Sequence, residues 1–292
     1  NTLGYIPCDK EHESVAKALE YAYDDWCISL LAGSLGDTVT QHRYQKLAKA
    51  YKHYFDPTVR FMRGKNSEGQ WRTPFNPRSS NHREDDYCEG TAWQWTWFVP
   101  HDIDGLVELM GGREGFISKL DSLFTADSSL EGSLVSADIS GLIGQYAHGN
   151  EPSHHIIHLY NYVEQPWKAQ ALVDSVLRTQ YFNDPNGLSG NEDCGQMSAW
   201  YIMNSMGFYQ PCPGRIEYSI GRPLFNTVTI KLPAGKMFRI VAKNNALENK
   251  YIESATLNGQ PLDRPFFTHD QLMEGGTLEL MMTDKPTRWG TK

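Results

Sequence analysis

The sequence changes its periodicity near Gly207, and this change most constrains the fold. Before Gly207, apolar side chains recur three or four residues apart, as in residues 13–32, a spacing typical of amphipathic helices. After it, short β-prone runs alternate with Pro, Gly and Asn turns. We therefore predict a mainly α chain with a C-terminal β module: a helical domain over residues 1–213 and a segment of short antiparallel strands over 214–292.

The spacing of apolar residues and of helix-breaking residues predicts the individual elements. We expect helices, arranged as antiparallel pairs, over 13–32, 38–54, 93–98, 104–110, 113–123, 138–146, 154–162, 165–179 and 196–206. Strands are expected over 216–220, 227–232, 238–242, 252–257 and 278–282, with a hairpin turn at Asn258-Gly259. Residues 62–86 have no period and predict a long loop, which is more often functional than idle.

Composition excludes several classes of protein. The net charge of −8 without basic runs argues against nucleic-acid binding, and the absence of Gly-x-Gly-x-x-Gly argues against a dinucleotide fold. The five Cys form no Cys-x-x-Cys pair, which argues against a zinc ribbon, and no apolar run is long enough to span a membrane. The chain starts at Asn1 without a signal-peptide pattern, so we expect a processed product or an excised piece.

Three polar segments stand out from the helical pattern. They are residues 87–94 (YCEGTAWQ), 146–155 (YAHGNEPSHH) and 190–196 (GNEDCGQ). Each concentrates acids, amides or histidines beside Gly or Pro, which fix the backbone around them. We expect the three segments to be loops at one end of a helical scaffold, where they line one polar site.

The acids of two segments are candidates for proton transfer. Glu89 lies close in sequence to Trp93, Trp95 and Trp97, and desolvation by aromatic surface would raise its pKa and suit it to donate a proton. The alternative is a Glu that caps a helix or lies in its first turn. In the third segment, one of Glu192 and Asp193 is expected to cap the following helix, which leaves the other to bind a cation or polarise a water.

The second segment suggests a metal site. His154 and His158 have the i, i+4 spacing of a zinc pair, with Glu151 as a possible third ligand, although both histidines could instead make local hydrogen bonds. The oxygen ligands Asn150 and Glu151 favour calcium over zinc. Two carboxyl groups beside aromatic surface are what glycoside hydrolysis requires. The residues alone thus indicate a polar, aromatic-lined site, such as that of a metal-assisted glycosidase.

The same segments carry a family resemblance. The motifs that carry it are residues 87–94, 99–102 (VPHD), 110–112 (MGG), 141–155 (GLIGQYAHGNEPSHH), 190–200 (GNEDCGQMSAW), 207–209 (GFY) and, near the start, 19–26 (LEYAYDDW). Together they resemble the calcium-dependent exo-α-mannosidases of glycoside hydrolase family 92. The resemblance extends over essentially the whole chain. It implies an N-terminal β-sandwich followed by an (α/α)6 barrel, and removal of terminal α-mannose with inversion.

The resemblance also assigns roles to individual residues. It implies that Glu89 is the general acid, that Asp193 is the general base, and that Asn191 occupies a position, often Asp in the family, that assists the base. It implies a calcium ion that holds mannose hydroxyls and helps to distort the ring, with Asn150, Glu151 and Asp193 at the metal. The residues implied in sugar binding are Trp93, Gln94, His101, Asp102, His148, Glu151, His154 and His155.

Family chains are much longer than this one. The resemblance therefore implies that the chain holds the second half of the barrel and a C-terminal β segment. It implies two partners, the N-terminal β-sandwich and a mannose-containing oligosaccharide. It also implies a periplasmic or secreted location. We expect a calcium-dependent inverting exo-α-mannosidase, and α-1,2 linkages are the first candidates for the bond that it cleaves. In an inverting enzyme, the carboxyls of the general acid and the general base should lie about 6.5–9.5 Å apart. The alternative is a non-catalytic fragment that binds sugar or a partner chain without a complete pocket.

Overall fold

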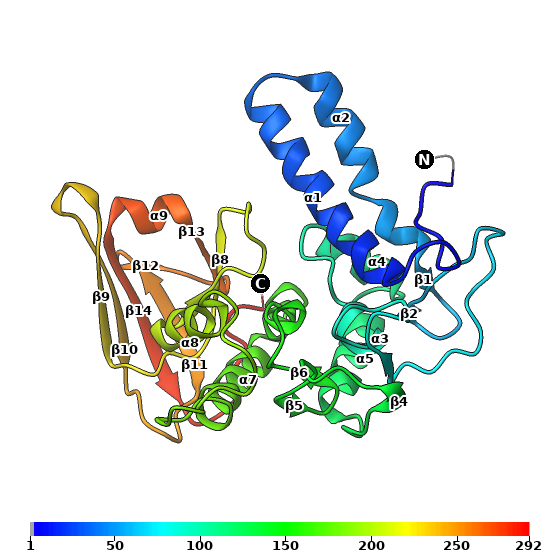
Figure 1. Cartoon of the computed structure of the whole chain (residues 1–292). Helices are drawn as coiled ribbons and strands as arrows, with labels where there is room; N and C mark the ends of the chain where they lie inside the picture. Colours follow the sequence, from blue (N-terminus) through cyan, green and yellow to red (C-terminus); the bar gives the residue numbers. More distant parts are fainter. Residues whose placement is uncertain (1–2, 292) are drawn as a thin grey trace. The chain divides into compact units, whose positions relative to one another are not determined.

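The computed structural model describes residues 3–291 and divides into two compact units between Ser153 and His154. Helices dominate up to Gly207 and strands follow it (Figure 1). The predicted fold class, mainly α with a C-terminal β module, is confirmed at this level. The predicted domain boundary after residue 213 stays a prediction. Within residues 3–291, no helix combines the length and the apolar character needed to cross a membrane.

The first unit begins with two long helices joined by a short turn, α1 (Ser14–Ser34) and α2 (Thr38–Leu47), which lie side by side (Figure 1). Asp37 caps α2 by accepting a hydrogen bond from the Thr40 N–H at 3.0 Å. The helix ends at Leu47, and a separate 3-10 turn, η1 (Ala50–His53), follows. The single helix predicted over 38–54 is thus broken. None of the α2 side chains is buried, so packing does little to extend the helix.

Shorter elements complete the first unit. They are helices α3 (Ala92–Trp95), α4 (Ile103–Leu109), α5 (Arg113–Thr125) and η2 (Glu151–Ser153), and the strand pairs β1–β2 (Phe55–Asp56, Phe61–Met62), β3–β4 (Ser79–Asn81, Glu131–Leu134) and β5–β6 (Leu142–Ile143, Tyr146–Ala147). The helix predicted over 138–146 is wrong, because this segment forms the β5–β6 hairpin. Gly141 and Gly144 adopt φ values of 61° and 59°, which interrupt a right-handed helix.

The N-terminus of α1 is fixed to the segment that precedes Glu89. The backbone N–H groups of Glu13 and Val15 donate to the carbonyls of Asp85 and Asp86 at 2.6 and 3.0 Å. The Ser14 hydroxyl donates to the Asp86 carboxylate at 3.0 Å. These bonds satisfy N–H groups that a helix start leaves without intrahelical partners. They therefore hold α1 in place relative to the chain around Glu89.

The second unit begins with helical segments that precede most of its strands. A 3-10 turn, η3 (Ile156–His158), runs into α6 (Leu159–Tyr162), and α7 (Pro166–Thr179) and α8 (Gln196–Met206) follow. Pro166 opens α7, where its missing N–H costs nothing. The Gln170 side chain on α7 accepts a hydrogen bond from the Ile252 N–H at 3.0 Å, which ties this helix to a strand of the sheet.

The strands form two sheets that share one apolar core. The five-stranded sheet has the order β12-β11-β14-β10-β9, and the three-stranded sheet has the order β13-β8-β7. Their bounds are β7 Phe208–Tyr209, β8 Glu217–Ile220, β9 Thr227–Lys231, β10 Met237–Lys243, β11 Tyr251–Leu257, β12 Gln260–Pro261, β13 Phe266–Thr268 and β14 Gly276–Thr283, with η4 (Pro233–Gly235) and α9 (His269–Glu274) between strands. Alternate side chains of β10 and β14, such as Phe238 and Leu280, enter the core.

The sheets confirm the predicted strands and correct their pairing in one place. Asn258 and Gly259 have φ values of 51° and 77° and connect β11 to β12, so the predicted hairpin turn is confirmed. The β10–β14 pair, however, is parallel. The strands are therefore not all antiparallel, because the chain makes β11, β12 and β13 before β14 returns to lie beside β10.

Candidate functional site

A pocket of about 250 Å³ in the first unit brings two of the three polar segments together. It is lined by Glu20, Cys88, Glu89, Trp95, Phe98, Asn150, Glu151 and Pro152. Within the described residues, its walls contain three carboxylates and no Lys, Arg or His side chain. The pocket is therefore acidic, with an aromatic wall, and it contains the candidate acid and two candidate metal ligands from the sequence.

Glu89 is held in an unusual backbone conformation at this pocket. Its φ is 46°, in the left-handed region that non-glycine residues rarely adopt and that costs free energy. The Asn150 amide donates to the Glu89 carbonyl at 3.0 Å, and the Trp95 indole N–H donates to the Cys88 carbonyl at 2.7 Å. A Cβ atom on Gly90 would lie 2.7 Å from the Trp95 Nε1, so only glycine fits there. These contacts fix the direction of Glu89 from both sides.

The structure also removes the alternative explanation of Glu89 as a helix cap. Thr91 caps α3, because its hydroxyl accepts from the Trp93 N–H at 3.2 Å while the Gln94 side chain accepts from the Thr91 N–H at 2.7 Å. The first turn of α3 contains no acid. Glu89 therefore lies outside the helix that it precedes, and the helix dipole does not explain its presence.

The groups around Glu89 carry excess negative charge. Glu20 is exposed, yet partial desolvation raises the pKa of its carboxyl, and the negative charges of Asp24, Glu13 and Glu89 raise it further. Burial, with the Glu13 and Glu89 charges, raises the pKa of the Cys88 thiol to about 12, so this thiol stays protonated and is a poor nucleophile. Within residues 3–291, neither the Glu20 nor the Glu89 carboxylate has a hydrogen-bond donor or a cation as partner.

The third polar segment, in the second unit, separates the roles of its two acids. Glu192 caps α8, because its carboxylate accepts from the Ser198 N–H at 3.0 Å and from the Ser198 hydroxyl at 2.9 Å. Asp193 is exposed and has a left-handed φ of 46°, and no described residue donates a hydrogen bond to its carboxylate. Asn191 is exposed in the same loop. Asp193 is thus the acid that stays available for chemistry.

Two predicted sugar-binding residues on α3 have structural contacts away from this pocket. Trp93 packs edge-to-face on Phe61, with ring centroids 4.9 Å apart, and lies 4.5 Å from the Lys119 ammonium. Gln94 is buried and donates to the Gln145 carbonyl at 2.6 Å. Neither residue lines the Glu89 pocket. Their roles in sugar binding stay predictions.

His101 and Asp102 also make structural contacts in the first unit. A ring nitrogen of His101 lies 2.9 Å from the Ala48 carbonyl. The Asp102 carboxylate accepts from the Tyr51 hydroxyl at 2.7 Å and from the Gly105 N–H at 3.2 Å, which caps α4. Neither lines the Glu89 pocket. Their predicted sugar contacts likewise stay predictions.

The remaining histidines of the second segment are buried and lie on both sides of the boundary between the units. In the first unit, His148 Nδ1 lies 2.8 Å from the Tyr146 hydroxyl. In the second, His154 Nδ1 lies 3.1 Å from the Gln196 amide, and His155 is 5% exposed. These positions do not test whether the three histidines contact a sugar. The predicted roles of His148, His154 and His155 therefore stay predictions.

His158 corrects the zinc alternative. Its two ring nitrogens lie 3.0 Å from the Ser219 hydroxyl and 3.0 Å from the Asn204 side-chain oxygen. Burial lowers its pKa to about 3, so the ring is neutral. With both nitrogens engaged, His158 has no lone pair for a metal, and the set of His154, His158 and Glu151 is wrong. Over residues 3–291, no cluster of three His, Cys, Asp or Glu residues is arranged to hold a metal ion.

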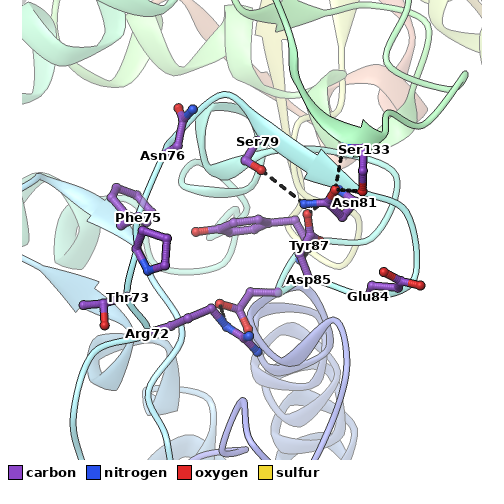
Figure 2. A pocket seen from close by; sticks show the side chains of 12 residues that line it. Arg72, Thr73, Phe75, Asn76, Ser79, Asn81, Glu84, Asp85, Tyr87 and Ser133 are labelled. Atoms are coloured by element: carbon purple, nitrogen blue, oxygen red, sulfur yellow. Dashed lines mark hydrogen bonds and ion pairs between the residues drawn. The ribbon is translucent and has the colours of Figure 1, made fainter.

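A second pocket, of about 460 Å³, is built largely from the loop predicted over 62–86 (Figure 2). Its polar groups bond to one another. The Asn81 side chain accepts from the Ser133 hydroxyl at 2.8 Å, the Asn81 N–H donates to Asp85 at 2.7 Å, and the Tyr87 hydroxyl donates to the Met62 carbonyl at 2.7 Å. In the Glu89 pocket, by contrast, the Glu20 and Glu89 carboxylates have no such partners within residues 3–291, so this pocket is the stronger candidate for catalysis.

Sequence reasoning missed one acid of the Glu89 pocket. Glu20 lies on α1, 69 positions before Glu89 in the chain, and reaches the pocket because α1 is tied to residues 85 and 86. Nothing in the sequence separates it from Asp24 and Asp25 on the same helix, since all three are acids in an amphipathic pattern. Only the tertiary contact distinguishes them.

Comparison with known proteins gives one consistent result. Residues 1–284 match the glycosyl hydrolase family 92 catalytic domain. The chain is similar to a GH92 alpha-mannosidase of Bacteroides thetaiotaomicron, solved in complex with mannoimidazole, with a TM-score of 0.93 and 41% identity over 99% of this chain and 38% of that one. It is also similar to a GH92 inverting mannosidase of the same organism, with a TM-score of 0.88 and 42% identity over 100% of this chain and 40% of that one.

A curated relative agrees with these structures. The chain is 30% identical to an uncharacterized secreted glycosidase of Arthroderma benhamiae over 99% of its own length and 39% of the relative. In each of these comparisons, the chain spans about two fifths of the longer protein.

Proposed function

The chain belongs to glycosyl hydrolase family 92, and from this we propose that it serves as part of an inverting exo-α-mannosidase that removes terminal mannose from glycans. The observation that carries the proposal is the acidic pocket around Glu89. There, two hydrogen bonds to main-chain carbonyls hold the left-handed backbone of Glu89, whose carboxyl has no partner within residues 3–291 and lines the same pocket as Asn150 and Glu151. The similarity to an alpha-mannosidase and an inverting mannosidase supports the choice of sugar and of stereochemistry.

In the proposed reaction, Glu89 gives its proton to the glycosidic oxygen as the bond from C1 to that oxygen breaks. Asp193 takes a proton from a water, whose oxygen bonds to C1 on the opposite face of the ring. The two carboxyls would lie about 6.5–9.5 Å apart, which leaves room for this water. The capping role of Glu192 supports Asp193 as the base, because it leaves Asp193 exposed. Asn191 would help to orient the base.

We propose calcium as the cofactor, with Asn150, Glu151 and Asp193 to hold it. The side chains fit a hard cation, because they present oxygen donors. The Asn150 amide nitrogen donates to the Glu89 carbonyl, and its oxygen has no donor within residues 3–291. When bound, calcium would hold hydroxyls of the terminal mannose and favour a distorted ring.

The proposed barrel, β-sandwich, linkage preference and location are features of a longer protein that contains this chain. We infer that the helices belong to the second half of an (α/α)6 barrel, and that an N-terminal β-sandwich completes the substrate pocket. A preference for α-1,2 linkages is the first candidate. A periplasmic or secreted location is supported by the similarity to a secreted glycosidase.

A non-catalytic, partner-binding role is the second candidate, and one observation favours it. The α1–α2 hairpin exposes large apolar side chains, with Leu31 at 61%, Leu35 at 75% and Val39 at 79% exposure. Clustered apolar exposure of this kind often marks a surface for another chain or domain. Such a surface is also compatible with catalysis by a longer protein, so an activity measurement decides between the two.

The test is release of mannose from α-1,2-mannobiose, with α-1,3-mannobiose as the comparison. We expect release in the presence of calcium, a loss of at least about tenfold after chelation, and restoration by calcium but not by zinc, because oxygen ligands favour the harder ion. Lack of release from both disaccharides by the folded full-length protein would contradict the proposal and favour the partner-binding role.

A further inference from the structure

We propose that Glu20 is a substrate-positioning residue whose carboxylate accepts a hydrogen bond from a hydroxyl of the terminal sugar in the Glu89 pocket. This inference rests on the proposed function and deepens it. Neither the polar segments of the sequence nor their family resemblance gave Glu20 a role. Its assignment comes from its place in the pocket, beside Glu89, Asn150 and Glu151.

The pocket places Glu20 with the groups that would meet the sugar. Glu20 lines the same 250 Å³ space as Glu89, Asn150 and Glu151, with Trp95 as an aromatic wall. A monosaccharide that reaches Glu89 through this pocket would therefore lie within reach of Glu20.

The scaffold holds Glu20 in a fixed place relative to Glu89. The hydrogen bonds from Glu13, Ser14 and Val15 to residues 85 and 86 fasten the start of α1 to the chain three and four residues before Glu89. Ala16, one turn before Glu20, is only 1% exposed, and Leu19, which directly precedes Glu20, is fully buried. Glu20 is thus carried on a helix whose other face is packed, as precise positioning of a ligand requires.

The acidic lining of the pocket indicates the chemistry of its ligand. An anionic carboxylate accepts hydrogen bonds and donates none, and the pocket wall offers it no cation. A neutral sugar presents several hydroxyl donors, whereas an anionic ligand would be repelled by the Glu20 and Glu151 carboxylates. The ligand that fits is therefore a neutral, polyhydroxylated ring, as a terminal mannose is.

The first test compares Glu20→Ala and Glu20→Gln with Asp24→Asn in the full-length protein. Asp24 lies one turn further on α1 and does not line the pocket, so it controls for a change of charge on this helix. We expect Glu20→Ala to lower kcat/KM about 10- to 100-fold, since removing one charged partner of a hydrogen bond has effects of this order. Glu20→Gln, which keeps an acceptor oxygen, should lose less, and Asp24→Asn should remain near the wild type.

The second test uses monodeoxy mannosides as substrates, which separates a hydroxyl contact from a structural role. If Glu20 binds one hydroxyl, the substrate that lacks that hydroxyl should be hydrolysed equally by the wild type and Glu20→Ala, whereas the other substrates keep the full difference. An equal loss on every deoxy substrate, or recovery of Glu20→Ala activity by excess calcium, would overturn the inference.

The failure of this inference and the failure of the proposed function are distinguishable. A wild-type protein that releases no mannose contradicts the proposed function itself. A wild-type protein that releases mannose, with Glu20→Ala equally active, contradicts only the role of Glu20. Thermal unfolding of each variant, with an unchanged Tm expected for Glu20→Ala, verifies that the loss is not one of folding.

Discussion

Replacing Glu89 by Gln should lower hydrolysis of α-mannobiose about 10²- to 10⁴-fold, the usual contribution of a positioned general acid. Gln keeps the size of the side chain but has no acidic proton to give to the leaving oxygen. The backbone contacts that fix this position use the main chain of residues 88 and 89, so the substitution leaves them in place. Initial rates of mannose release from wild type and variant measure the effect.

An activated substrate provides the control for Glu89→Gln. A dinitrophenyl leaving group departs without protonation, so the variant should hydrolyse dinitrophenyl α-mannoside at a rate much closer to that of the wild type. An equally large loss on both substrates would argue against the acid role. It would indicate instead that Glu89 binds the sugar or supports the pocket.

Replacing Asp193 by Asn should lower hydrolysis by a similar factor, but on both substrates. A general base activates water whichever group leaves, so a better leaving group does not restore the rate. The exposed Asp193 carboxylate has no hydrogen-bond donor within residues 3–291, so its loss should hardly change the free energy of unfolding. Rates on the disaccharide and on the dinitrophenyl glycoside, together with urea unfolding, test both points.

The neighbouring acid gives the matched control. Glu192→Ala removes the side chain that caps α8 through Ser198, so we expect it to lower the free energy of unfolding by about 0.5–2 kcal/mol. Its catalytic rate should change far less than that of Asp193→Asn. Full activity of Asp193→Asn, or a larger catalytic loss in Glu192→Ala, would show that Asp193 is not the general base.

The strongly periodic elements could be predicted from the sequence. Helices α1, α7 and α8 each bury one face. Strands β9, β10, β11 and β14 overlap the predicted runs, and the last three extend one or two residues beyond them. The helix prediction failed where apolar residues have helical spacing but the chain forms no helix. Over 138–146, apolar spacing favoured a helix, but left-handed Gly141 and Gly144 direct the chain into a hairpin. The parallel β10–β14 pair depends on strand order, which local patterns do not encode.

The candidate site could be predicted only in part. Glu89 and Asn150 were found because each lies in a segment of unusual polarity, and the structure places both at one pocket of the first unit. The sequence could not say which of Glu192 and Asp193 caps α8, because both precede the helix, and the hydrogen bonds to Ser198 decide it. Glu20 was missed because its role depends on a tertiary contact of α1.

The measurement that tests the central claim most directly is the configuration of the first sugar released. The full-length protein would be mixed with an aryl α-mannoside in an NMR tube, and the anomeric proton of mannose followed from the first minutes. The account predicts that β-mannose appears first and that α-mannose grows in later by mutarotation, as water attack opposite the leaving group requires. Initial α-mannose would indicate retention through a covalent intermediate, with carboxyls about 5 Å apart, and would contradict the roles given to Glu89 and Asp193.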